Sequence, residues 1–171
     1  MSITFHADGT ITGSKLTLPE GSGCKGAIIQ RVKVERGGNA GTSDVSRNSV
    51  GGWDDVNTVS FTPFYSNSII NMYMNYSVGA QAGADFYFRF AYLPSGGSDT
   101  EIERTGIQRV NDAQDALSSR FAWSHQWVQG NTSTYTYKLQ GYKDGGGSAI
   151  VWYHTYGNAT TSIFEITEIK Q

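Results

Sequence analysis

The feature that most constrains the fold of this chain is a strict alternation of apolar and polar side chains over long runs. Apolar residues occupy every second position of residues 70–78 and again of residues 86–92. Successive side chains of an extended strand point to opposite faces, so a period of two is typical of strands with one buried face. Residues 27–35 follow the same pattern, with Ile28, Val32 and Val34 on one face. We therefore predict a strand over each of these three segments.

The rest of the chain repeats this pattern between glycine-rich breaks. Further strands are predicted at residues 56–61, 101–110, 121–127, 135–139, 148–154 and 162–169. Loops or turns are predicted at residues 36–52, 94–98 and 143–147, and residues 111–118 fit either one helical turn or a loop. The 21 glycines, 10 tyrosines and 8 phenylalanines suit a chain of aromatic strands and many turns. Eight or nine strands, roughly one every 12 to 18 residues, predict an all-β fold, an antiparallel β-sandwich of the jelly-roll type.

The first 25 residues differ from the remainder and are predicted to form a separate arm and linker. Residues 3–5 and 10–12 are short β-type runs around an Asp-Gly turn signal, and residues 19–23 are a Pro-, Gly- and Ser-rich connection. A two-stranded ribbon is marginally stable alone in water, so this arm is expected to dock on its own domain, a sister subunit or a larger assembly. The predicted domains are the arm, residues 1–25, and the β-sandwich, residues 26–171.

Charge, hydropathy and cysteine content exclude several classes of protein. The 13 basic and 15 acidic side chains give a net charge of −2, which offers no electrostatic case for nucleic-acid binding. No apolar run approaches the ~20 residues of a membrane-spanning helix, so membrane insertion is not expected. The single Cys24 excludes an intrachain disulfide. Residues 1–6 lack a basic segment followed by an apolar core, so we expect no signal peptide and synthesis in a cytoplasm.

No local motif supports catalysis, a metal or another cofactor. The chain has no Gly-x-Ser-x-Gly segment, and its histidines (His6, His125 and His154) lie on separate elements. Three pairs of carboxylates are candidates for glycoside hydrolysis, namely Asp54 with Asp55, Asp112 with Asp115, and Glu101 with Glu103. Neighbouring Asp54 and Asp55 would point to opposite faces of a strand, whereas Glu101 and Glu103 would share one. Loop solvation explains all three pairs better, so we expect no enzyme.

Aromatic residues are the strongest positive feature of the sequence. The four tryptophans and ten tyrosines exceed what one small core needs, which leaves rings for subunit interfaces or for stacking on sugars. Trp123 and Trp127 alternate with polar residues and are predicted to lie in the core or an interface. Trp53 lies in a Gly-Gly-Trp-Asp-Asp segment, interpreted as an exposed loop. With Asp54, Asp55 and Arg89 it forms the candidate contact for a glycan or a protein partner.

The order of short motifs along residues 26–171 resembles the jelly-roll domains of tailed-bacteriophage virion proteins. The opening GAIIQRV of residues 26–32 is similar to the start of those domains, and residues 61–63 (FTP) with 68–70 (SII) to their next junction. Residues 135–140 (YTYKLQ) and 160–166 are similar to their ending. The ribbon over residues 3–10 is similar to the one that often precedes them.

This resemblance implies a noncatalytic homotrimeric protein on the virion surface. A chain of one arm and one sandwich, without a fibrous shaft, suits a capsid decoration (cement or head-fibre) protein better than a whole tail fibre. The arm would then bind the major capsid protein or a tail protein by adding strands to an exposed edge. Its expected anchoring residues are Ile3, Phe5, Ile11, Leu16 and Leu18. The alternative is a receptor-binding fibre tip or carbohydrate-binding module that recognises host surface glycans.

Overall fold

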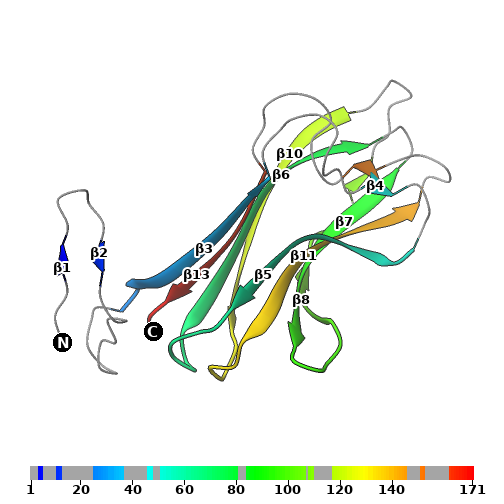
Figure 1. The fold of residues 1–171 in the computed structure, drawn as a ribbon. Helices are drawn as coiled ribbons and strands as arrows, with labels where there is room; N and C mark the ends of the chain where they lie inside the picture. Colours follow the sequence, from blue (N-terminus) through cyan, green and yellow to red (C-terminus); the bar gives the residue numbers. More distant parts are fainter. Residues whose placement is uncertain are drawn as a thin grey trace.

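The computed structural model is an all-β protein whose two antiparallel sheets pack face to face (Figure 1). It describes residues 4–5, 11–12, 25–36, 46–47, 51–80, 84–106, 108–109, 117–145, 151–152 and 162–171. Within them no helix is long and apolar enough to cross a membrane. A separate two-stranded ribbon pairs β1 (Thr4–Phe5) with β2 (Ile11–Thr12).

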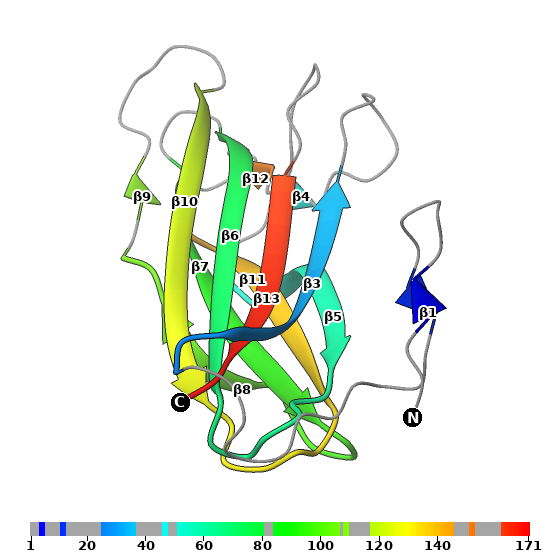
Figure 2. The same cartoon turned by 90° about the vertical axis from the view of Figure 1, so that its left-hand side faces the viewer.

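The first sheet has four long strands. β3 (Ile28–Arg36) pairs with β13 (Ser162–Ile169), β13 with β6 (Ile69–Ala80), and β6 with β10 (Leu117–Val128). Beyond the first residue of β13, the two-residue strand β12 (Val151–Trp152) joins β6 to β4 (Ser46–Arg47). Figure 2 views this sheet from outside, with β10 and β3 at its two borders.

The second sheet has the order β5, β11, β7, β8. These strands are β5 (Trp53–Phe61), β11 (Tyr135–Gly145), β7 (Asp85–Pro94) and β8 (Thr100–Arg104). The two-residue strand β9 (Gln108–Arg109) pairs with the start of β7.

The pairing of the eight long strands is nested along the chain. The first pairs with the last (β3 with β13), the second with the second-last (β5 with β11), and then β6 with β10 and β7 with β8. Antiparallel strands nested in this way over two sheets form the jelly roll, an eight-stranded double Greek key. The predicted fold class is therefore confirmed.

The core lies between the sheets and is built by the alternating positions that the sequence singled out. Fully buried side chains of β6 (Ile70, Met72, Met74, Tyr76) face those of β7 (Phe86, Phe88, Phe90). The Trp123 ring of β10 stacks on Phe90 with 4.1 Å between ring centroids. Trp127 and Phe121 are half-buried against the same core, so the expectation of a core role for Trp123 and Trp127 is confirmed.

Three local predictions are wrong at their boundaries. The strand predicted over residues 101–110 is divided into β8 and β9, because the Thr105 backbone and hydroxyl turn back to bond the backbone of Phe88. The turn predicted at residues 143–147 begins too early, since β11 continues to Gly145 beside β7. Trp53 is not in a loop: it is the first residue of β5, opposite Tyr142. Of residues 111–118, only Leu117 and Ser118 are described, and both belong to β10.

Candidate functional site

A network of charged and polar side chains crosses the outer face of the second sheet. Lys138 on β11 donates from Nζ to Asp55 Oδ2 of β5 and to Asp99 of the turn after β7, at 2.9 and 3.1 Å. The neighbouring Gln140 donates from Nε2 to the same two carboxylates and accepts, at Oε1, a 2.7 Å bond from Arg89 Nε. Gln140 is buried beneath these partners although it lies on the outer side of the sheet. Its amide therefore connects β5, β11 and β7 through satisfied hydrogen bonds.

The network continues onto β8 through Glu101. Its carboxylate accepts two hydrogen bonds from Arg104, at 2.7 and 2.9 Å, and lies 3.4 Å from Arg89 Nη1. A bidentate arginine–carboxylate pair fixes both side chains in one plane. The four strands β5, β11, β7 and β8 are thus linked across one face by ion pairs and by the amide of Gln140.

An aromatic cluster borders this network. The rings of Trp53, Tyr87 and Tyr142 lie about 5 Å apart, with 5.3 Å between Trp53 and Tyr87 and 4.9 Å between Tyr87 and Tyr142. The Arg89 guanidinium carbon lies 3.9 Å from the Trp53 ring centroid, a cation–π contact. Arg89 and the two tyrosines therefore pack around the Trp53 ring, which is half-buried.

The ion pairs shift the pKa values of three side chains in the network towards their charged forms. Burial acts to raise the pKa of Asp99, yet the hydrogen bonds from Lys138 and Gln140 outweigh it and lower that pKa below its ordinary value. Burial likewise opposes ionisation of Glu101, but the Arg104 and Arg89 contacts lower its pKa. The pKa of Lys138 is raised, because Asp55 and Asp99 together outweigh the cost of its burial. All three groups are charged at neutral pH.

The lowered pKa values of Glu101 and Asp99 do not suit the general acid of a glycoside hydrolase. A general acid needs a carboxyl group that keeps its proton near neutral pH, and the arginine and lysine contacts of Glu101 and Asp99 favour the opposite. Glu101 and Glu103 do not share a face as predicted, because a β-bulge at Ile102 separates them. Glu103 instead lies 4.0 Å from His125 on the opposite sheet. Among the described residues, no group of three or more His, Cys, Asp and Glu side chains is placed to hold a metal ion.

The structure brings together three of the four residues proposed as a contact site. Trp53 touches Arg89, and Asp55 reaches Arg89 through Gln140. Asp54, the fourth residue, lies opposite Gly141 in the pairing of β5 with β11. Of the proposed anchoring residues, Phe5 pairs with Ile11 across the β1–β2 ribbon. Ile3, Leu16 and Leu18 lie outside the described residues, as do Cys24, Asp112 and Asp115.

Sequence reasoning missed most of the network. Lys138 and Gln140 alternate with the buried Tyr137 and Leu139, so the period of two already placed them on an outer face. Their acidic partners come from β5 and from the turn after β7, segments far away in the chain. Only the register of β11 with both neighbours shows that these side chains meet.

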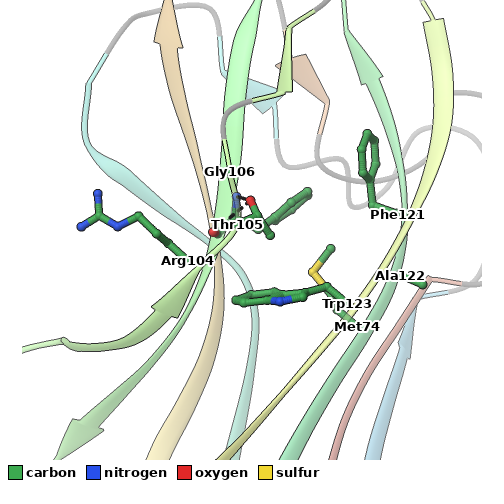
Figure 3. Close-up of a pocket in the computed structure, with 8 residues that line it drawn as sticks. Met74, Arg104, Thr105, Gly106, Phe121, Ala122 and Trp123 are labelled. Carbon is green, nitrogen blue, oxygen red and sulfur yellow. Dashed lines mark hydrogen bonds between the residues drawn. The ribbon is translucent and has the colours of Figure 1, made fainter.

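A cavity of about 320 Å³ lies between the sheets, on the side where β8 and β10 approach (Figure 3). Its walls are the side chains of Met74, Phe88, Phe121 and Trp123 together with Ala122 and residues 104–106. In Figure 3 the Arg104 guanidinium extends to the side away from Phe121, consistent with its bonds to Glu101. The cavity is lined mainly by aromatic and apolar groups and brings no ionised pair together.

Comparison with known proteins gives structural likenesses without a family. No model of a protein family matches the chain, and no curated protein sequence does. Similar solved structures include the VP2 subviral particle of infectious bursal disease virus, at 6% identity and a TM-score of 0.44, over 83% of this chain and 41% of that one. T=1 particles derived from the same virus give 8% identity and a TM-score of 0.45, over 93% of this chain and 44% of that one. The structure of its Gt strain gives 6% and 0.44, over 98% and 50%. This chain thus spans half or less of the length of these proteins.

Proposed function

We propose that this chain is a noncatalytic structural protein of a bacteriophage virion, and specifically a homotrimeric capsid decoration protein displayed on the virion surface. The observation that carries the noncatalytic part is the network on the second sheet. Its carboxylates are held by lysine, arginine and glutamine across strands instead of converging on the cavity. The virion part rests on the jelly-roll strand order and on the sequence resemblance over residues 26–171.

The proposed anchor is the arm of residues 1–25. The two strands of its ribbon form only two residue pairs, Thr4 with Thr12 and Phe5 with Ile11. Such a short ribbon gains stability when a further strand or an apolar surface covers it. We therefore assign the arm to the shell or to another virion protein, which it would reach by strand addition.

The test is binding to shells of the virus that encodes the chain, prepared without this protein. The full chain should co-sediment with the shells, whereas a chain lacking residues 1–25 should remain in the supernatant and still be a trimer. A double Leu16→Asp, Leu18→Asp variant should lose binding too, and a Lys33→Asp, Glu35→Lys variant, altered on exposed β3 side chains, should retain it. Equal binding by the full and shortened chains would reject the arm as anchor, and a monomeric native mass would reject the trimer.

A receptor-binding or carbohydrate-binding role is the second candidate, favoured by the aromatic cluster. Trp53, Tyr87 and Tyr142 lie on the outer face beside Arg89, a pairing of rings and hydrogen-bond donors that suits sugars. On a glycan array this role predicts binding that Trp53→Ala abolishes and that Tyr73→Ala, on the other sheet, leaves intact. The decoration role predicts no specific glycan signal, and shell binding that Trp53→Ala leaves unchanged.

A further inference from the structure

One border of the first sheet is formed by a long strand, β10, whose outer side pairs with none of the described strands. β10 pairs with β6 residue by residue from Leu117–Ala80 to Val128–Ile69, with no register shift. Within the part of the chain that the structure describes, no second strand pairs with β10. Figure 2 shows β10 at the border of the sheet, opposite β3. Residues 121–128 therefore present a straight edge of backbone N–H and C=O groups.

This edge lacks the features that keep the other sheet borders from pairing. The other three borders carry charged side chains: Arg31, Lys33 and Glu35 on β3, Asp54 and Asp55 on β5, and Glu101, Glu103 and Arg104 on β8. Each of these three strands also carries the extra residue of a register shift against its partner: Ile29 on β3, Val56 on β5 and Ile102 on β8. Residues 121–128 (FAWSHQWV) contain no Asp, Glu, Lys, Arg or Pro. Charges, prolines and bulges are the usual protection of edge strands, and β10 has none of them over this stretch.

The charge pattern of β10 fits a second copy of itself. When two copies of one strand pair antiparallel about a two-fold axis, every residue faces a residue of the same segment. A charged residue near the axis would then meet a like charge, which is unfavourable across a strand pair. The outward side chains Ala122, Ser124 and Gln126 are exposed, small or uncharged. Two copies of residues 121–128 can thus approach without like-charge repulsion.

We propose that β10 pairs antiparallel with β10 of a second copy of this chain, so that the two first sheets become one continuous sheet. Val128, one of the exposed large apolar residues at 41% exposure, would be covered at the ends of this contact. Eight paired residues span about 27 Å. The contact is small, about 270 Å² per copy for a sheet edge of this length and roughly 10 Å thickness, so we expect a concentration-dependent dimer.

This inference goes beyond the proposed function and does not depend on it. A two-fold contact is separate from the three-fold contact of a trimer. A chain with only the β10 contact forms dimers, whereas a chain with both contacts forms hexamers or larger assemblies. The native mass therefore distinguishes the two proposals.

The test uses a short bismaleimide on single-cysteine variants in which Cys24 is replaced by Ser. Ser124→Cys places a thiol at the middle of the edge, where its counterpart would lie within about 8 Å, either directly opposite or diagonal. Ser60→Cys, on the exposed side of β5, is the matched control. We expect covalent dimers from Ser124→Cys at least tenfold faster than from Ser60→Cys. Equal rates would overturn the proposal.

Sedimentation equilibrium supplies the second readout. Ser124→Lys should weaken the two-fold contact at least tenfold, because two lysines would meet at the axis, and Ser60→Lys should leave it unchanged. A native mass of one or three copies at every concentration would refute the β10 contact, as would a dimer that Ser124→Lys does not affect. If the edge is covered by the chain's own arm, the two-fold dimer would appear only after deletion of residues 1–25, and the proposal for the full chain fails.

Discussion

Glu168 offers the sharpest test of how this fold is held together. It is fully buried on β13, where its carboxylate accepts hydrogen bonds from three donors. Its Oε1 accepts from the backbone N–H groups of Phe64 and Tyr65 at 2.9 and 3.1 Å, and its Oε2 from Gln30 Nε2 at 2.6 Å. One side chain of the last strand thus fixes the connection between β5 and β6 and the start of β3.

Replacement by glutamine keeps the size of the side chain but turns one acceptor into a donor. If the new amide nitrogen faces Gln30, two NH₂ groups oppose each other, and Gln30 cannot flip freely because its Nε2 also donates to the Thr62 carbonyl at 2.7 Å. If the new nitrogen faces the backbone, the N–H groups of residues 64 and 65 lose their acceptor. Each hydrogen bond to a charged group contributes about 1.5–3 kcal/mol, so Glu168→Gln should destabilise the fold by about 2–3 kcal/mol.

Urea unfolding followed by tryptophan fluorescence measures this loss. With a slope of roughly 2 kcal/mol per molar, the midpoint should fall by about 1–1.5 M. Glu165→Gln is the matched control on the same strand. It loses the ion pair with the exposed Arg31, which is worth at most about 1 kcal/mol, and its amide oxygen can still accept the hydrogen bond from the Thr167 hydroxyl. Equal midpoints for the two variants would refute the assignment of Glu168 as the anchor of this connection.

Further predictions concern the outer network and the core. The pKa values of Asp99 and Glu101 are lowered in the folded state, so their ion pairs stabilise the fold above the ordinary pKa values of 3.8 and 4.5, and this stability is lost as the pH falls below them. The double variant Asp99→Asn, Glu101→Gln should therefore flatten the acid side of a profile of unfolding free energy against pH, and an unchanged profile would contradict this. Phe90→Ala removes a fully buried ring stacked on Trp123 and should cost about 3–5 kcal/mol in urea unfolding, whereas a loss below about 1 kcal/mol would mean that the core collapses onto the gap. Tyr137→Phe deletes a buried hydroxyl that donates to a glutamine side chain and should cost about 1 kcal/mol, with near-UV circular dichroism showing that the aromatic core is intact.

The sequence pattern predicts the strands well where one face is buried and the other exposed. β6, β7 and β13 follow their predicted segments closely, because alternation in these strands reflects burial directly. The sequence pattern does not predict a strand end that is set by pairing with a neighbouring strand. Trp53 lies in a glycine-rich stretch that resembles a loop, and it belongs to β5 only because Tyr142 of β11 lies opposite.

The candidate contact site is harder to predict because it depends on register. Single-residue bulges turn neighbouring side chains to new faces, as Ile102 does between Glu101 and Glu103. A pattern of alternation does not reveal such a bulge, and one misplaced residue reverses every later side chain of the strand. Residue type alone predicts a contact site at Trp53, Asp55 and Arg89. A glutamine such as Gln140 has no residue type that marks it as part of such a site.

The insertion of β13 between β3 and β6 has a consequence for how the chain is made. Among the described strands, the one that completes the middle of the first sheet is also the last in chain order, so it is translated after both β3 and β6. Until it is made, β3 has no neighbour among the described strands of its sheet, and β6 has an unpaired edge that another nascent chain can occupy. Chains dominated by such long-range pairings fold slowly and are prone to aggregate while incomplete. On one message translated by many ribosomes, the emergence of β13 is therefore the step that commits each copy to its own fold.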